Sequence, residues 1–414
     1  MRINRFLLFF LFTVLFKTSL FPSNWTRFRG PNGTGKAMSL IFPNQWEKNA
    51  YLWSLELPGV GHSSPVIWEN KVFTTCADEK NGDQYILCIN SKNGKVLWQK
   101  KIQSVHYRHH KFNSFASSTP CVDKDFLIVS WTTKKTNDLL CFDHNGVLRW
   151  RRNFGEYLTQ HGSGFSPILY QEKVFITHDH EGDSAILALD RKTGETIWRT
   201  NRIGSKPSAS TPCVYSPQNG SPQLISNSMS HGCYSIDIKS GKVLWETGLD
   251  SLDKRSVSSP VQSGDFFLAT CGSGGRGSRL IAVHPPAGPT LKVPATYTLS
   301  RNVPYVPTPL PVGSFIFLLT DGGIVSCVKR ETGKILWKER VEGNYFASPI
   351  IIKGIIFIVS TEGVVTTLQI NEEKMTILGN SQLNELTHNT PAVGNSSLFF
   401  RTYSKLFCLP SKSL

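Results

Sequence analysis

Ser166-Pro167-Ile168-Leu169-Tyr170 opens a stretch of this chain that closes at Thr193-Gly194-Glu195-Thr196-Ile197-Trp198, and variants of the stretch recur along the 414 residues. Each copy begins with Ser or Thr followed by Pro, and successive prolines lie 40 to 55 residues apart. A repeat of this period indicates one supersecondary unit copied around a ring or along an array. The eight openings are Ser64-Pro65, Thr119-Pro120, Ser166-Pro167, Thr211-Pro212, Ser259-Pro260, Thr308-Pro309, Ser348-Pro349 and Thr390-Pro391.

The copy that begins at Ser166 contains several short runs typical of β-strands. These runs are residues 167–169, 174–177, 186–190 and 196–198. Apolar runs of about five residues separated by Gly, Asn and Asp turns favour an antiparallel four-stranded sheet. Gly194 stands where a tight turn needs a positive φ, and Trp198 offers a flat face for packing on a neighbouring sheet. The Trp is lost near Leu291 in the fifth copy and near Ile377 in the seventh.

The number of strands favours a closed ring. Tyr51-Leu52-Trp53-Ser54-Leu55 precedes the first opening and has no sheet of its own, whereas the last copy, residues 391–409, shows only three strand-like runs. The early run can supply the missing fourth strand and remove the exposed edges. We therefore predict an all-β fold, an eight-bladed β-propeller of four-stranded antiparallel blades over residues 48–414. It follows an N-terminal segment at residues 24–47, and a strand within residues 51–57 closes the ring by pairing with the last blade.

The repeat also carries a family resemblance. Residues 188–198, Ala-Leu-Asp-Arg-Lys-Thr-Gly-Glu-Thr-Ile-Trp, resemble the eleven-residue tryptophan-docking motif of quinoprotein-type propellers. The same spacing recurs at residues 88–98, 235–245 and 327–337. Together with the N-terminal stretch Phe28-Arg29-Gly30-Pro31-Asn32-Gly33, the chain more closely resembles the secreted bacterial PQQ-like β-propeller repeat proteins. The resemblance implies the fold but not the activity, because propellers host many unrelated functions.

Some proteins with this motif are dehydrogenases that use pyrroloquinoline quinone (PQQ) with calcium. The resemblance implies, for such an enzyme, two adjacent cysteines under the cofactor, a stacking Trp, and Glu, Asn and Asp at the calcium ion. This sequence has no Cys-Cys pair, and its calcium ligands cannot be assigned. We therefore expect no cofactor, and PQQ with calcium stays the alternative.

The first 23 residues have the pattern of a secretory signal peptide. Met1-Arg2-Ile3-Asn4-Arg5 is basic and residues 6–16 form an apolar core, with cleavage expected between Ser19 and Asn24. Lys17 interrupts the apolar run, so a spanning helix of about twenty residues is not available, and an uncleaved anchor is the alternative. No cysteine lies near the cleavage region, which disfavours a lipoprotein. The sequence predicts a periplasmic or secreted protein with no transmembrane span in its mature chain.

Nine cysteines in an exported protein raise the possibility of disulfide bonds. Several of them, however, occupy a slot that alanine fills in other copies. The slot holds Cys88, Cys141, Cys327 and Cys408, and also Ala188 and Ala282. Because a free cysteine packs as a small apolar residue, we predict buried thiols rather than a disulfide framework.

The chain is basic, with 45 Lys and Arg against 30 Asp and Glu and a net charge of +15. A field of that sign favours anionic partners. No recognised nucleic-acid module is present, and an exported chain rarely meets nucleic acid. We expect an envelope protein or an anionic polymer as partner and no nucleic acid. A basic surface that only keeps the protein soluble is the alternative, and the oligomeric state is left open.

Nine of the eleven histidines map to the loops of one face of the expected ring. His62 and His388 each stand three residues before an opening Pro, in the first and eighth copies, which ring closure makes neighbours. His110, Asn113 and His161 precede the openings of the second and third copies. We predict these five as ligand-binding residues that line half of the funnel, because neutral imidazole can ligate a metal or transfer a proton. Histidines that only hydrogen-bond or face solvent are the alternative; the metal is left open, and no catalytic residue is assigned.

Two further stretches have weaker patterns. His178-Asp179-His180-Glu181-Gly182-Asp183 spaces acids as cation loops do but lacks the twelve-residue calcium pattern. Gly272-Ser273-Gly274-Gly275-Arg276-Gly277-Ser278 could hold an anion through backbone N–H groups. No helix is expected to follow it, so neither a Rossmann nor a P-loop interpretation holds, and a flexible loop is the simpler interpretation.

These patterns favour an exported, non-catalytic β-propeller that binds or scaffolds in the bacterial cell envelope, with an unidentified ligand. Two alternatives stay open: a PQQ-dependent quinoprotein dehydrogenase and a propeller subunit of the outer-membrane protein assembly machine. A hydrolase or lyase that uses the histidine face is a third. Whether the protein is an enzyme is left open, with a binding protein favoured.

Overall fold

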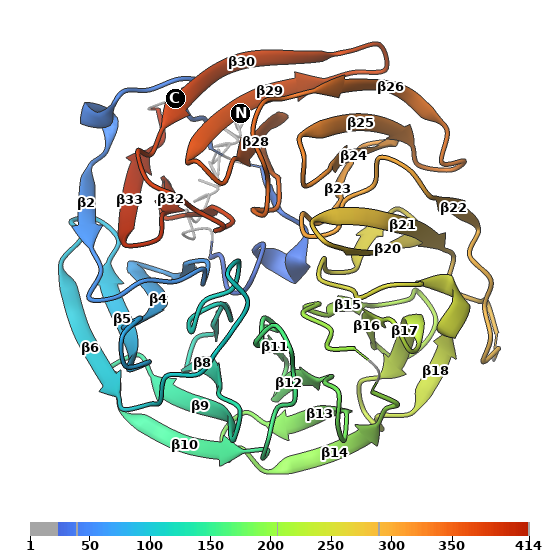
Figure 1. Ribbon diagram of the computed structural model, residues 1–414, viewed down its shortest axis with the longest axis horizontal. Coiled ribbons are helices and arrows are strands. Elements are labelled where there is room, and N and C mark those ends of the chain that lie inside the picture. Colours follow the sequence, from blue (N-terminus) through green and yellow to red (C-terminus); the bar gives the residue numbers. More distant parts are fainter. Residues whose placement is uncertain (1–23, 39, 205, 289, 413–414) are drawn as a thin grey trace, which may run out of the picture.

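The computed structural model describes residues 24–38, 40–204, 206–288 and 290–412. The predicted signal peptide, residues 1–23, lies outside the described residues. The strands form eight small sheets. Figure 1 shows them arranged around a central axis, with the chain running once around the ring. The sheets are antiparallel and four-stranded, except that blade seven has a fifth, parallel strand. The predicted all-β, eight-bladed β-propeller is confirmed.

Each blade starts at the axis and ends at the rim of the ring (Figure 1). Blades one and two comprise β3 (Val66–Trp68), β4 (Lys71–Ala77), β5 (Gln84–Asn90), β6 (Val96–Ile102), β7 (Cys121–Val122), β8 (Phe126–Thr132), β9 (Asn137–Asp143) and β10 (Leu148–Asn153). Blades three and four comprise β11 (Ile168–Tyr170), β12 (Lys173–His178), β13 (Ala185–Asp190), β14 (Thr196–Asn201), β15 (Cys213–Tyr215), β16 (Gln223–Ser228), β17 (Gly232–Asp237) and β18 (Val243–Glu246).

The second half of the ring repeats the plan. Blades five and six comprise β19 (Val261–Ser263), β20 (Phe266–Ser273), β21 (Arg276–Val283), β22 (Tyr297–Leu299), β23 (Leu310–Val312), β24 (Phe315–Leu319), β25 (Ile324–Lys329) and β26 (Ile335–Arg340). Blades seven and eight comprise β27 (Ile350–Ile352), β28 (Ile355–Val359), β29 (Val364–Ile370), β30 (Met375–Gln382), β31 (Ala392–Gly394), β32 (Ser397–Arg401) and β33 (Lys405–Pro410), with β1 (Lys36–Ala37) and β2 (Trp53–Glu56) added from the N-terminal side. The short 3-10 helices are η1 (Pro31–Gly33), η2 (Lys48–Ala50) and η3 (Leu249–Ser251).

Strand β2 closes the ring as the outer strand of blade eight. It pairs antiparallel with β33, in a register that runs from Trp53 opposite Cys408 to Glu56 opposite Lys405. The pairing satisfies a strand edge that would otherwise be open to solvent. The predicted closure, by a strand from residues 51–57 on the last blade, is confirmed.

Outer-strand tryptophans fasten several of the blades to the next one. Trp150 Nε1 donates a 3.0 Å hydrogen bond to the Arg191 carbonyl oxygen. Its ring lies against Gly194, where an added Cβ would stand 2.7 Å from the indole. Gly194 has a φ of +72°, so both the backbone conformation and the close approach require glycine. The same contact recurs between Trp53 and Gly94, Trp98 and Gly146, and Trp198 and Gly241.

Blade five departs from the expected position of its outer strand. The lost Trp was expected near Leu291, but β22 begins at Tyr297, and the Tyr297 ring packs on the turn of blade six where Trp packs elsewhere. Its hydroxyl donates a 2.8 Å hydrogen bond to the Arg330 carbonyl oxygen. Leu291 instead lies beside blade four, because its carbonyl oxygen accepts a 2.8 Å bond from the Glu246 N–H. A long connection has moved the last strand along the sequence without changing the contact it makes.

The expectation that every blade has four strands is wrong for blade seven, because the N-terminal segment adds a strand to it. β1 pairs in parallel with β27, with Lys36 opposite Ile351, so blade seven has a fifth strand at its axial edge. Figure 1 shows this segment, in blue, at the middle of the ring. The first strands leave a channel there, and a chain that enters it finds unpaired axial edges to bind.

Along its course the segment contacts the inner strands of several blades. Trp25 forms a β-bridge with Ile67 of blade one. The Asn32 side chain exchanges two hydrogen bonds with the backbone of Val214 in blade four, at 2.7 and 2.8 Å. The segment therefore crosses the channel from blade one to blade seven and acts as a plug. We call residues 24–37 the plug below.

The Ser and Thr residues that precede the eight opening prolines form a ring of hydrogen bonds around the channel. At most steps the backbone N–H donates to the hydroxyl oxygen of the equivalent residue in the next blade, as Ser64 does to Thr119 at 3.1 Å and Thr390 to Ser64 at 3.1 Å. Seven of the eight steps have this bond, and the step from Ser166 to Thr211 lacks it among the described contacts. We call these residues the hydroxyl ring: Ser64, Thr119, Ser166, Thr211, Ser259, Thr308, Ser348 and Thr390. The bonds explain the hydroxyl before the proline at seven of the eight openings.

The cores between the blades are apolar, and all nine cysteines lie buried and free in them. Burial raises the pKa of the Cys88 thiol to about 12, which keeps it protonated and unreactive. The prediction of cysteines that pack as small apolar residues is confirmed. No helix in the described part of the chain is long and apolar enough to span a bilayer.

Candidate functional site

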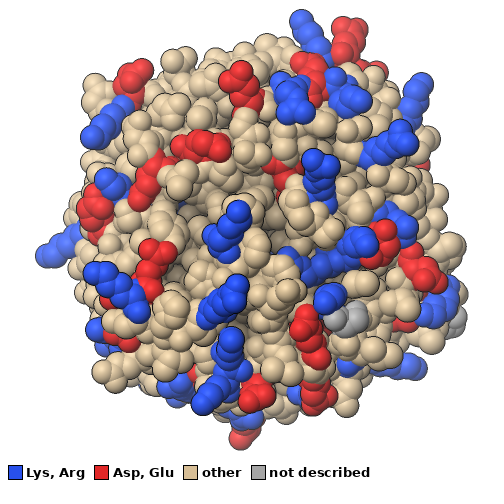
Figure 2. Space-filling model, viewed as in Figure 1, with Lys and Arg blue, Asp and Glu red and all other residues tan. Residues whose placement is uncertain are grey.

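The loops that lead into the first strands surround a cavity of about 390 Å³ on the channel axis. Figure 2 shows the central hollow of this face, with basic side chains beside it. Phe28 of the plug contributes to the lining, so the cavity is closed toward the opposite face. All five residues predicted from the sequence line the cavity. They are His62, His110, Asn113, His161 and His388.

His62 and His388 form a stacked pair, with 4.1 Å between ring centroids. They precede β3 and β31, the first strands of blades one and eight, and ring closure brings those strands together. Burial, reinforced by the neighbouring ring, holds the pKa of His62 well below its usual value. Burial also lowers the pKa of His388 to about 4. Both imidazoles are therefore neutral at physiological pH.

His110 and His161 form a second pair, with ring centroids 5.1 Å apart. Burial, together with the charge of Arg255, lowers the pKa of His161 to about 4. The Asn113 amide donates to the His161 carbonyl oxygen at 2.8 Å and to the Ser163 carbonyl oxygen at 3.1 Å. Because both amide hydrogens are used, Asn113 joins the two loops and fixes where His161 stands.

Aromatic side chains lie between the two histidine pairs. They were not among the residues predicted from the sequence. Phe112 lies 5.2 Å from Phe346 and 6.4 Å from His388, measured between ring centroids. Phe346 also packs edge-on against His388, at 4.7 Å. The repeat could have revealed Phe346, because it stands three residues before Pro349, where His62 and His388 stand in their own copies.

Among the described residues that line this cavity, Arg255 is the one with a charged side chain. It precedes β19 in blade five, and its guanidinium donates to the Tyr305 hydroxyl oxygen at 2.6 and 2.9 Å. The described lining contains no Asp or Glu. A second cavity of about 1010 Å³ continues from the first toward blades five to eight, and its lining mixes Lys111, Arg276 and Arg340 with acids.

The donor set of the first cavity does not fit a calcium–quinone pair. Calcium prefers several carboxylate and carbonyl oxygens, and the cavity offers imidazoles, hydroxyls, one amide and one guanidinium. Nowhere in the described part of the chain do three or more His, Cys, Asp or Glu groups gather as metal ligands. The four histidines are divided into two pairs by Phe112, so they do not converge on one point.

The other two sequence stretches lie between the second and third strands of blades three and five. In the loop at residues 178–183, Asp183 pairs with Arg199 and Glu181 with Lys206, so these two acids point to different cations. Residues 274–275 are the two-residue turn of the β20–β21 hairpin, both with positive φ, and they overhang the two cavities. This tight turn replaces the flexible loop that was expected there.

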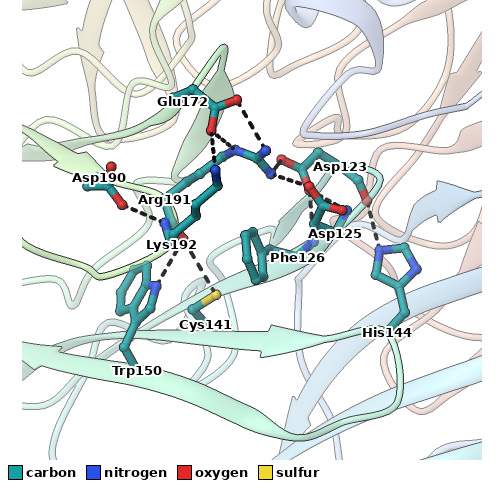
Figure 3. Close-up of polar contacts among 10 residues, drawn as sticks. All are labelled: Asp123, Asp125, Phe126, Cys141, His144, Trp150, Glu172, Asp190, Arg191 and Lys192. Carbon is teal, nitrogen blue, oxygen red and sulfur yellow. Dashed lines mark hydrogen bonds and ion pairs between the residues drawn. The ribbon is translucent and has the colours of Figure 1, made fainter.

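The largest ionic cluster of the described residues lies at a joint between blades. Figure 3 shows the Arg191 guanidinium held between Asp123, Asp125 and Glu172, with nitrogen–oxygen distances of 2.9, 2.8 and 3.1 Å. The backbone carbonyl of Arg191 also accepts the Trp150 indole N–H. The Arg191 guanidinium binds acids of blade two and of blade three, so the cluster joins these two blades.

A model of the family described as outer membrane protein assembly factor BamB matches residues 82–293 and 303–374, more than half of the chain. The chain belongs to this family. No curated protein sequence matches it significantly. The assignment supports the resemblance to PQQ-like propeller repeats, whereas the subgroup marked by residues 28–33 stays a prediction.

Several solved structures share the fold at low sequence identity. BamB from Moraxella catarrhalis aligns with a TM-score of 0.62 and 14% identity, over 87% of this chain and 99% of that one. Quinohemoprotein alcohol dehydrogenase from Comamonas testosteroni aligns with a TM-score of 0.63 and 10% identity, over 95% of this chain and 81% of that one. The computationally designed Ika8 protein aligns with a TM-score of 0.61 and 12% identity, over 87% of this chain and 99% of that one. At such identities the likeness concerns the fold alone.

Proposed function

We propose that the protein is an exported, non-catalytic β-propeller of the bacterial cell envelope that binds a partner through the cavity face. The observation that carries the proposal is the lining of the central cavity: neutral histidines, aromatic rings and one guanidinium, with no carboxylate. Such a concave, mostly apolar pocket with a few convergent polar groups is typical of binding sites. The net charge of +15 favours an anionic envelope polymer or an acidic region of an envelope protein.

The same lining argues against hydrolysis by a nucleophile. A Ser or Thr nucleophile needs a base within hydrogen-bond reach, and the base needs a group that orients it. In the described cavity no hydroxyl is hydrogen-bonded to a histidine ring nitrogen, and no carboxylate is present to orient one. Binding is therefore the activity that these side chains support best.

Site-specific photo-crosslinking in the native host tests the proposal. A photo-reactive residue replaces Phe112, which is 50% exposed on the cavity face, and the control replaces Ile197, which is 46% exposed on the outer strand of blade three. We expect one defined adduct from position 112 and none from position 197. Equal labelling from both positions, or no adduct from either, would refute binding through this face.

The family assignment favours a second candidate, a role in outer-membrane protein assembly. If the chain has that role, its removal lowers the amount of folded outer-membrane β-barrels, and the adduct at position 112 is a component of the assembly machinery. Normal barrel levels in the deletion strain would exclude this candidate and leave a binding role elsewhere in the envelope.

The dehydrogenase alternative has a direct test of its own. Protein purified from its native envelope is analysed for quinone and calcium, and apo protein is titrated with both. Stoichiometric quinone and calcium together with dye-linked alcohol oxidation would overturn the binding proposal. We expect neither, because the cavity offers no carboxylate for the metal ion.

A further inference from the structure

We propose that the closed end of the channel is an oxyanion site, in which the hydroxyl ring and Arg255 bind a phosphate or carboxylate group of a small ligand, while three buried guanidiniums near the ring favour its negative charge. The inference rests on the proposed binding function and names the chemistry that the cavity takes. Two independent observations carry it: unused hydroxyl hydrogens and uncompensated buried cations.

The hydroxyl ring has hydrogens to donate. Seven of its members line the 390 Å³ cavity: Ser64, Thr119, Ser166, Thr211, Thr308, Ser348 and Thr390. Every member of the ring is at most 5% exposed. Each hydroxyl oxygen that takes part in a described bond accepts a backbone N–H, and none donates its own hydrogen to another described group. Hydroxyl hydrogens rotate freely, so several can turn toward one acceptor on the axis.

Three buried arginines bind the backbone beside the ring. Arg27, Arg29 and Arg401 are 6%, 1% and 1% exposed, and none makes an ion pair in the described part of the chain. Burial lowers the pKa of Arg29 to about 9 and those of Arg27 and Arg401 to about 10, so all three stay charged at neutral pH. Unpaired buried charges are costly, and an anion would compensate them.

The guanidiniums bind backbone carbonyls that are next in sequence to members of the hydroxyl ring. Arg27 donates to Pro212 at 2.5 Å, beside Thr211, and Arg29 to Pro349 at 3.1 Å, beside Ser348. In the same way, Arg401 donates to the Ser63 carbonyl oxygen at 2.6 Å, beside Ser64. Each of these guanidiniums therefore binds the backbone beside the ring, where its charge favours an anion in the cavity although it does not line the cavity itself.

The surroundings fit an anion that enters from the histidine face. Phe28 closes the far end, Arg255 adds a cation to the wall, and the lining carries no carboxylate to repel an anion. The four histidines are neutral and can donate a ring N–H without competing for the charge. A volume of about 390 Å³ admits a small ligand or the end of a polymer.

Calorimetric titration of the full mature protein tests the proposal, with inorganic phosphate and succinate as probes in a buffer free of other multivalent anions. We expect at least one probe to bind in a single site. Ser348→Ala removes one donor of the ring and should weaken binding about tenfold, because a hydrogen bond to a charged group is strong. Ser235→Ala is the matched control: its buried hydroxyl donates to Gln223 at 2.6 Å within blade four, outside the cavity lining, and binding should be unchanged.

Arg255→Gln provides a second variant that leaves the ring and the plug intact, and it should also weaken binding about tenfold. Preference for phosphate or for succinate identifies which oxyanion the site takes. Absence of binding by both probes, or equal weakening by Ser235→Ala and Ser348→Ala, would overturn the oxyanion site. The photo-crosslink from position 112 is the separate readout of the proposed function: if it persists while both anions fail, only the oxyanion site is wrong.

Discussion

The contact between Gly194 and Trp150 allows a quantitative prediction about how the blades are joined. Gly194→Ala places a methyl group 2.7 Å from the indole of Trp150, closer than real carbon contacts allow. It also puts a side chain on a residue whose φ is +72°. The left-handed conformation costs about 1–2 kcal/mol for a residue other than glycine. Overpacking of a tight contact costs about 1–3 kcal/mol. We therefore expect the free energy of unfolding to fall by about 2–5 kcal/mol.

A matched control separates the two contributions. Gly313 has a φ of +58°, and an added Cβ there would have no atom within 4 Å. Gly313→Ala should therefore cost only the backbone part, about 1–2 kcal/mol. The assay is urea denaturation followed by tryptophan fluorescence. If Gly194→Ala is no more destabilising than Gly313→Ala, the packing of Trp150 on the turn does not hold blades two and three together.

Three further outcomes are expected. Arg401→Met should lower the free energy of unfolding by about 3 kcal/mol, measured by urea denaturation. The reason is that hydrogen-bond acceptors in blade one lose a buried partner, among them the Thr75 carbonyl oxygen at 2.6 Å. A loss below about 1 kcal/mol would refute this. A thiol reagent should label no cysteine of the native protein and all nine in guanidinium chloride. A reductant should leave the melting temperature unchanged. Labelling before unfolding would contradict the burial of the thiols. His388 has a pKa of about 4 in the folded protein and about 6.5 when unfolded, so the unfolded state binds the extra proton. The free energy of unfolding therefore decreases as the pH falls from about 7 to 4, and His388→Gln should remove about 1–3 kcal/mol of this decrease. Identical profiles of stability against pH for the variant and the parent protein would refute the assignment.

The repeat in the sequence was sufficient for the architecture because each blade is determined locally. A Ser or Thr before Pro, short apolar runs, a Gly turn and a Trp recur at one period, and the surplus strand at Trp53 indicated how the ring closes. The failures at blades five and seven have a common reason. Tyr297 replaces a Trp after a long connection, and β1 adds to β27 from a distant part of the chain, so neither follows the period.

The candidate site was predicted in part. The predicted ring closure placed His62 and His388 in neighbouring blades, and in the structure their rings stack on each other. Phe346 and Arg255 also precede first strands, but the prediction rested on histidines and one asparagine and did not include them. The role of Asn113 in joining two loops depends on contacts between loops 48 residues apart, which no local pattern shows.

The sequence by itself determined the eight blades, their order and the face on which the histidines lie, since strand patterning and turn chemistry act between neighbouring residues. Only the tertiary structure decided what the middle of the ring contains. The plug brings Arg27 and Arg29 beside carbonyls more than 180 residues away, and the hydroxyls of eight separate copies meet at one axis. That convergence comes from closing the ring, which places positions that are equivalent in the repeat, and distant along the chain, around one channel.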